Sequence, residues 1–194
     1  VFDGASAALA AENLWRAYAD IAAGRETQDQ TGADFADFAA WERALQTTPA
    51  GRAQRDHWRI VLARPLPVVD LPADRPAQPG AAIDGQTVER RLPAATVQAA
   101  RRLAASLAIT PAALYLGILA LLLHRLTGQR DMVIGVPALR RPSRAFARTI
   151  GYFVNMVAPR LEVAAGASAA QVLRETHRRL ALALDHGDYP FAAI

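Results

Sequence analysis

Five prolines between residues 65 and 79 constrain most strongly how this chain can fold. They stand at positions 65, 67, 72, 76 and 79. Each proline fixes the backbone angle φ and lacks an N–H donor, so this stretch can continue neither a helix nor a central strand. We therefore predict an extended connector over residues 65–85 and place the domain boundary there.

The segments before the connector are helical in pattern. Apolar residues recur near a period of 3.6 within residues 5–23, 34–46 and 54–62. In the first segment, one stripe carries Leu14, Trp15, Tyr18 and Ile21. Three helices are therefore predicted for the first third of the chain.

The segments after the connector mix strands with helices. Alternation predicts a strand over 86–92, a short apolar run predicts one over 131–136, and residues 153–161 are predicted to be a strand or extended. Helices are predicted over 93–108, 111–127 and from Ser168 to Asp185. Thr110 followed by Pro111 is a helix start signal, and Gly128 a stop signal. The helix between them is apolar nearly all round, so we expect it to be central in an α/β layered fold.

Composition and charge exclude several classes of function. The chain has no cysteine, which excludes disulfides, thiolate catalysis and cysteine-ligated zinc. The net charge is +4, and every basic residue is arginine. No acidic residue stands between Asp131 and Glu162, so this stretch is either a site for a phosphate or an acidic partner or a solvated loop. Its five arginines are Arg140, Arg141, Arg144, Arg148 and Arg160. Nucleic-acid binding would rest on charge alone, and we expect none.

No targeting or membrane segment is visible in the sequence. The longest apolar run, 112–123, is shorter than the ~20 residues that a helix needs to cross a bilayer. No charged and then apolar leader follows Val1. We expect a soluble, cytoplasmic piece of a larger protein that does not bind membranes.

Spacing alone assigns no catalytic group. The histidines, at positions 57, 124, 177 and 186, lie far apart and form no metal-binding pattern. Each is interpreted as a surface or core residue, and we expect no metal. Asp185, His186 and Asp188 form a loose acid–histidine cluster, for which we favour a polar turn that ends a helix.

Four short segments, in order, carry a resemblance to a known family. They are Phe2-Asp3-Gly4, Asp34–Trp41, Ile150–Asn155 continuing to Arg160, and His186–Phe191. Together they resemble the condensation domain of nonribosomal peptide synthetases, whose consensus segments read HHxxxDG, YxDYAxW, IGxFVNxxxxR and HxDxPF. Leu71–Pro76 is similar to the LPTDRP linker of that family. Arg140 and Arg141 stand where the family often has Gly-Arg, so the glycine of that loop is replaced here.

The resemblance implies a fold of the chloramphenicol acetyltransferase-like type. Such domains have two lobes, each an α/β two-layer sandwich, with a tunnel between them. Residues 1–64 would be the C-terminal part of the first lobe, and 86–194 the first part of the second. The chain would then be a partial domain, truncated at both ends.

The resemblance also implies an activity, namely amide bond formation between carrier-tethered acyl and aminoacyl thioesters. The general base would be the second histidine of HHxxxDG, two positions before Val1, so no catalytic residue is expected within the chain. The expected partners are upstream and downstream peptidyl carrier domains and an adjoining adenylation domain. Their phosphopantetheine arms serve as substrate tethers, and no cofactor is expected to bind directly.

The same resemblance gives candidate site residues. Asp3 would form an ion pair that shapes the active-site loop, with Arg140 or Arg141 as its partner. Gly4 would let the backbone come close to a substrate arm. Asn155 would position substrate in the tunnel, or would serve the structure alone. The aromatic rings of Phe35, Phe38 and Trp41 are interpreted as packing.

Two other functions remain open at this stage. One is an acyltransferase of the same superfamily that uses coenzyme A thioesters or esterifies alcohols. The other is a degenerate domain that binds carrier proteins without catalysis. The FVN letters at 153–155 favour condensation over epimerisation and heterocyclisation. The substrates cannot be derived from the sequence.

Overall fold

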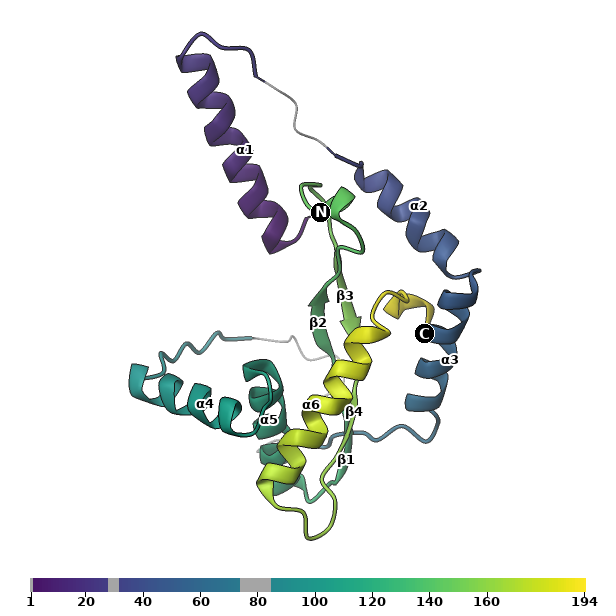
Figure 1. Ribbon diagram of the computed structural model, residues 1–194. Helices are drawn as coiled ribbons and strands as arrows, with labels where there is room; N and C mark the ends of the chain where they lie inside the picture. The colour runs from purple at the N-terminus through teal and green to yellow at the C-terminus, as the bar shows by residue number, and fades with distance from the viewer. Residues whose placement is uncertain (1, 28–31, 74–84) are drawn as a thin grey trace. The chain divides into compact units, whose positions relative to one another are not determined.

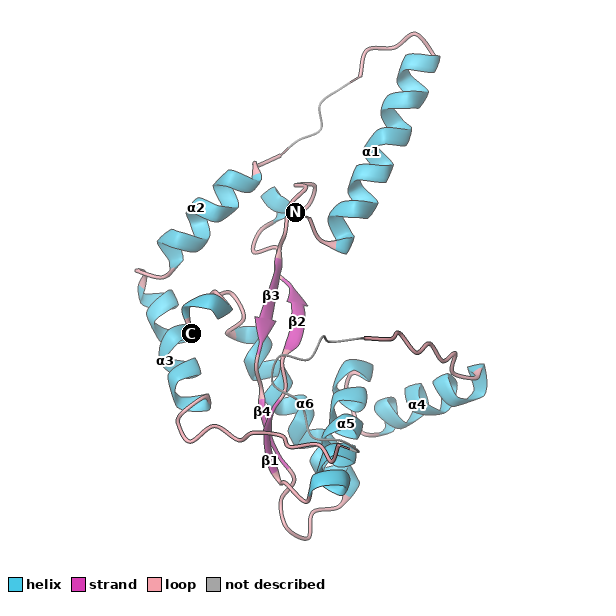
Figure 2. Cartoon of the chain, turned by 180° about the vertical axis from the view of Figure 1, so that it is seen from behind, coloured by secondary structure: helices cyan, strands magenta, loops and turns pink. Residues whose placement is uncertain are grey.

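A computed structural model describes residues 2–27, 32–73 and 85–194 (Figure 1). The helices are α1 (Gly4–Ala22), α2 (Phe35–Leu45), α3 (Pro49–Val61), α4 (Ala94–Ser106), α5 (Pro111–Thr127) and α6 (Ala169–Asp185). The strands are β1 (Asp131–Val133), β2 (Val136–Leu139), β3 (Val154–Val157) and β4 (Arg160–Glu162). Two short 3₁₀ helices, η1 (Arg144–Phe146) and η2 (Phe191–Ala193), complete the described elements (Figure 2).

The chain divides into two compact units that interleave in sequence. Unit 1 comprises residues 1–63, 135–158 and 183–194, and unit 2 comprises 64–134 and 159–182. The resemblance assigns residues 1–64 and 86–194 to the two lobes of a complete condensation domain. This assignment stays a prediction. Residues 74–84 of the predicted connector, with the second half of the LPTDRP-like segment, lie outside the described residues.

Unit 1 is built around the antiparallel pair of β2 and β3. Their register pairs Val136 with Val157 and Leu139 with Val154. An aromatic core of Phe38, Phe146 and Phe153 packs beside them, joined by Phe35 and Trp41. The rings of Phe38 and Phe153 are 4.6 Å apart. This confirms the interpretation of the aromatic segment 34–41 as packing.

Unit 2 pairs β1 with β4 and packs α4 against α5. Asp131 is opposite Glu162 in the antiparallel register. The core contains Ala104, Ile109, Leu114 and Leu173. The start and stop signals of α5 are confirmed: the Thr110 hydroxyl accepts a hydrogen bond from the N–H of Ala113, and Gly128 ends the helix at a φ of 73°.

Two of the strand predictions differ from the structure. The strand predicted over 86–92 is wrong, because residues 85–93 are irregular and Val88 and Leu92 are 79% and 53% exposed. The alternation is real, but a strand needs a neighbour to bond with, and these residues pair with no other described strand. The strand predicted over 131–136 is broken after Val133 into β1 and β2. The prediction that 153–161 is a strand or extended is confirmed: the segment contains β3 and most of β4, which are separated at Ala158 and Pro159, since proline brings no N–H to a ladder.

Two helices expose large apolar side chains to solvent. The predicted stripe on α1 exists, but Leu14, Trp15, Tyr18 and Ile21 are each 65–71% exposed. The prediction that α5 is central holds for one face only, which buries Ala113, Leu114, Leu116, Gly117 and Ala120. Its other face exposes Tyr115, Ile118, Leu119, Leu122 and Leu126.

Within the described ranges, no single helix combines the length and apolar character needed to cross a membrane. Among the described helices, α4 and α5 taken together have the length and composition of a span, but they are bent by 100° relative to each other.

Candidate functional site

The candidate site lies in unit 1 and begins with Asp3, at the N-terminus of α1. The carboxylate of Asp3 caps the helix: Oδ1 accepts a hydrogen bond from the N–H of Ser6 at 2.7 Å. Oδ2 accepts one from the N–H of Phe153 at 2.9 Å. The N–H of Asp3 donates to the carbonyl of Gly151 at 3.2 Å. One buried side chain therefore ties the start of α1 to residues 151–153, which stand far away in sequence.

Ser6 and Arg141 complete this network around Asp3. The hydroxyl of Ser6 donates to the carbonyl of Gly151 at 2.7 Å and accepts from the N–H of Gly151 at 3.0 Å. A guanidinium nitrogen of Arg141 lies 3.2 Å from that hydroxyl and 3.8 Å from Oδ1 of Asp3. Of the two predicted partners of Asp3, the structure therefore selects Arg141.

Arg141 is itself held on several sides. Its guanidinium lies 4.1 Å from the centre of the Phe153 ring, in cation–π geometry. One nitrogen donates to the carbonyls of Phe146 and Thr149, the latter at 2.8 Å. The arginine thus joins Asp3 to the loop that carries η1.

The electrostatics keep Asp3 ionised. Burial by itself raises the pKa of this carboxyl, but the hydrogen bonds from Ser6 and Phe153 and the charge of Arg141 outweigh burial and lower the pKa below its ordinary value. A carboxylate so bound serves as a structural ion rather than as a proton acceptor.

Two glycines of the motifs have different surroundings. A Cβ on Gly151 would lie 2.1 Å from the Phe35 ring, so only glycine allows this approach. A Cβ on Gly4 would meet no described atom within 4 Å. The expected approach of a substrate arm to Gly4 stays a prediction.

Arg140 has a partner other than Asp3. Its Nε donates to Oδ1 of Asp188 at 2.8 Å, and a second nitrogen reaches the same oxygen at 2.5 Å. A third nitrogen donates to the carbonyl of Leu184 at 3.1 Å. The acid–histidine cluster at 185–188 is thus a turn after α6 that is anchored to the end of β2, as favoured from the sequence.

Asn155, on β3, uses its whole amide to hold the same segment. Its Nδ2 donates to the carbonyls of Gly187 and Tyr189 at 2.9 and 2.7 Å. Its Oδ1 accepts from the N–H of Phe191 at 3.0 Å. This geometry favours the structural alternative for Asn155, and contact with a substrate in a tunnel stays a prediction.

A small cavity lies beside these residues, within unit 1. Its volume is about 20 Å³, the size of one water molecule, and Glu42, Arg140, Asn155 and Asp188 are among its lining residues. Burial raises the pKa of Glu42.

Sequence reasoning missed one pair of residues in this unit. The rings of His57 and His186 stack with centres 3.7 Å apart and planes 8° apart. No local pattern signals a contact between residues so far apart in the chain.

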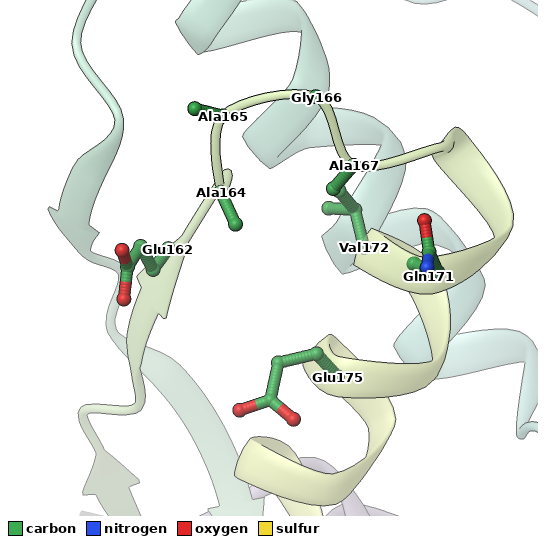
Figure 3. A pocket seen from close by; sticks show the side chains of 8 residues that line it. All are labelled: Glu162, Ala164, Ala165, Gly166, Ala167, Gln171, Val172 and Glu175. Atoms are coloured by element: carbon green, nitrogen blue, oxygen red, sulfur yellow. The ribbon is translucent and has the colours of Figure 1, made fainter.

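A larger pocket, of about 350 Å³, lies in unit 2 (Figure 3). Figure 3 shows the carboxylates of Glu162 and Glu175 on opposite sides of it and the turn 164–167 above them. Hydrogen bonds from Arg178 and Arg179 lower the pKa of Glu175 to about 2, although burial opposes them. Among residues 2–27, 32–73 and 85–194, no group of three or more histidines and carboxylates is placed to hold a metal ion.

Comparison with known proteins places this geometry in a family. The family model described as "Condensation domain" matches residues 1–194. Polyketide synthase PksN of Bacillus subtilis is 33% identical over 195 residues, which is 100% of this chain and 4% of that protein. Phosphinothricin tripeptide synthetase PhsC of Streptomyces viridochromogenes is 36% identical over 160 residues, which is 82% of this chain and 15% of that protein.

Solved structures agree with the sequence relatives. The first condensation domain of the CDA synthetase superposes with a TM-score of 0.79 at 26% identity, covering 100% of this chain and 42% of that one. The X-domain from teicoplanin biosynthesis gives a TM-score of 0.84 at 26% identity, covering 98% of this chain and 44% of that one. The chain thus spans less than half of the solved domains and a small part of the curated relatives. The fold and the motif residues together show that this chain belongs to the condensation domain family.

Proposed function

We propose that this chain is part of a domain that forms amide bonds between acyl and aminoacyl thioesters tethered to carrier proteins. The observation that carries the proposal is the buried network of Asp3, Ser6 and Arg141 around Gly151 and Phe153. It joins two of the family's motif segments, DG and IGxFVN. The resemblance requires an aspartate that shapes a loop and does not take a proton, and the ion pair supports this role.

The general base of the proposed reaction is the histidine expected two positions before Val1. It would deprotonate or position the amine of the acceptor, which then attacks the donor thioester. The nitrogen–carbon bond forms as the carbon–sulfur bond breaks, and the donor's phosphopantetheine thiol leaves. Holding both tethered substrates in one tunnel would supply several kcal/mol through proximity.

The residues of this chain would support that reaction by fixing the surrounding backbone. Arg140 and Asn155 hold segment 186–191 through side-chain hydrogen bonds to Asp188 and to three backbone groups. Arg141 and Asp3 hold segment 151–153. The backbone around the bound substrates would then already be ordered, so little free energy would be spent on organising it during the reaction.

The partners in this proposal are upstream and downstream carrier domains with an adjoining adenylation domain, all in the cytoplasm. The phosphopantetheine arms of the carriers deliver the substrates. Arg144 is exposed on η1 and could meet an acidic carrier surface, whereas Arg148 is bonded to Glu12 and Asn13.

We further propose that residues 1–194 alone do not catalyse amide formation. The exposed apolar faces of α1 and α5 support this, because monomeric proteins rarely leave such stripes open. We propose that the remainder of the domain covers them and completes the tunnel.

A second candidate function is carrier or partner binding without catalysis. It is favoured by the likeness to the X-domain from teicoplanin biosynthesis, which has also been solved as a complex with OxyB. A degenerate domain would keep the same Asp3 network and would differ at the histidine expected two positions before Val1.

The test uses the full-length protein with donor and acceptor loaded on their carrier domains. Intact-protein mass spectrometry follows transfer of the acyl group to the acceptor. We expect a condensed product on the downstream carrier, and none from residues 1–194 alone. Carrier binding without product would favour the binding module. Product only from acyl-coenzyme A would favour the acyltransferase alternative.

A further inference from the structure

The stacked histidines His57 and His186 have no part in the function proposed above. His57 lies on α3, and His186 lies just after α6, at the start of segment 186–191. Their rings are nearly parallel, 8° apart, with centres 3.7 Å apart. Both side chains are half-buried, so water reaches the pair but does not surround it.

The stack lies at the centre of the contact between α3 and segment 186–189. Trp58, buried beside His57, donates from Nε1 to the carbonyl of His186 at 2.9 Å. One turn earlier, Oε1 of Gln54 accepts from the N–H of Tyr189 at 2.8 Å. These two hydrogen bonds bracket the stacked rings and link the same two segments.

The stack is a candidate for a response to pH because imidazole is the side chain whose ordinary charge change falls between about pH 5 and 8. Two neutral imidazoles attract each other face to face, whereas two imidazolium ions at this distance repel. Burial, and then the charge of His186, lower the pKa of His57 below its ordinary value. Folding therefore favours the neutral ring of His57.

Other charges flank the pair on both sides. On α3 these are Arg55, Asp56 and Arg59; Asp185 is the last residue of α6, and Asp188 follows that helix. Asp56 is paired with Arg55, and Asp188 is paired with Arg140. These two carboxylates already have cationic partners to neutralise them.

We propose that the His57–His186 stack is a pH-sensitive latch, which holds α3 against segment 186–189 while both rings are neutral and releases it when both are protonated. The contribution of the latch is present above the ordinary histidine pKa of about 6.5 and is lost as pH falls below it. The segment also stays bound through the hydrogen bonds that it receives from Arg140 and Asn155. Opening is therefore confined to the α3 side.

The test is hydrogen exchange of the full-length protein, corrected for the intrinsic effect of pH and read by mass spectrometry. Between about pH 7.5 and about pH 5.5, we expect protection of peptides from α3 and from 183–194 to fall about fivefold, the effect of two unit charges about 4 Å apart in water. Peptides from α4 serve as the internal reference.

The variant His57→Phe keeps a ring in the stack but cannot be protonated. It should abolish the fall in protection, whereas the control His177→Gln, on α6, should leave the fall unchanged. If all peptides of the His57→Phe variant exchange rapidly, that variant does not fold, and His57→Tyr is measured in its place. A fall that persists in the folded variant, or protection that is independent of pH in the parent protein, overturns the latch. Either result leaves the proposed amide formation untouched.

Discussion

Replacing Asp3 with alanine removes the centre of the network in unit 1. The substitution removes the carboxylate that caps α1 at the N–H of Ser6, and it leaves the N–H of Phe153 without its acceptor. It also removes the carboxylate that lies 3.8 Å from the guanidinium of Arg141. Loss of a cap costs about 1 kcal/mol, and an unsatisfied buried N–H costs about 1–3 kcal/mol. Removing one partner of a buried ion pair costs about 3–5 kcal/mol.

These contributions overlap, so they do not add. Arg141 also keeps its bonds to the carbonyls of Phe146 and Thr149, which compensate part of its charge. We therefore expect Asp3→Ala to lower the free energy of unfolding by about 3 kcal/mol, near the lower limit for a buried pair.

The assay is urea unfolding of the complete domain, in which the midpoint shifts and the slope stays the same. The matched control is Asp20→Ala, which removes a pair with the exposed Arg25 and should cost less than about 1 kcal/mol. If Asp3→Ala costs no more than Asp20→Ala, the Asp3 network does not hold the motif segments together.

The dependence on pH gives an independent check of the same network. Because the folded pKa of Asp3 is lowered, its stabilising effect is present above its ordinary pKa of about 3.9 and is lost as pH falls through the lower folded value. Asp3→Asn should flatten the acid limb of the stability curve, and a limb of unchanged slope would contradict the assigned ionisation.

Four further predictions concern other positions. Asn155→Ala removes three hydrogen bonds to segment 187–191 and should cost about 2–3 kcal/mol in urea unfolding; a cost below about 0.5 kcal/mol would show that the segment is held elsewhere. Gly128→Ala should cost about 1 kcal/mol, because the residue has a φ of 73° and a methyl group there meets open space; no change in melting temperature would contradict this. An NMR titration should place the Glu175 carboxyl near a pKa of about 2, with its small stabilising effect present above its ordinary pKa and lost as pH falls towards 2; an ordinary midpoint would show that its pairs with Arg178 and Arg179 are broken in solution. Arg144→Glu should weaken carrier binding at low salt, and equal affinity of variant and parent would exclude η1 from the docking surface.

Local signals were enough to predict most of the helices. Thr110, Pro111 and Gly128 gave both ends of α5, because capping and left-handed backbone depend on neighbouring residues only. The 3.6-residue period likewise located α1, but it could not show what covers the apolar stripe. Whether the apolar stripe is buried depends on other segments of the protein, about which the periodicity of one helix carries no information.

Long-range pairing could not be derived in the same way. Alternation at 86–92 predicted a strand, yet a strand exists only where a partner supplies its hydrogen bonds. In the site, the resemblance pointed to Asp3 with Arg140 or Arg141, and only the fold separated the two arginines, giving Arg140 to Asp188. The contact between His57 and His186 had no signal in the sequence at all.

The central claim is that this chain belongs to a domain that forms amides with a histidine base. The most direct test replaces the residue two positions before Val1 with alanine in the full-length protein and measures the rate of amide formation on carrier-bound substrates. We predict that this residue is histidine and that the rate falls about 100- to 10,000-fold, the usual contribution of a general base. A different residue at that position in an active protein, or an unchanged rate in the variant, would contradict it.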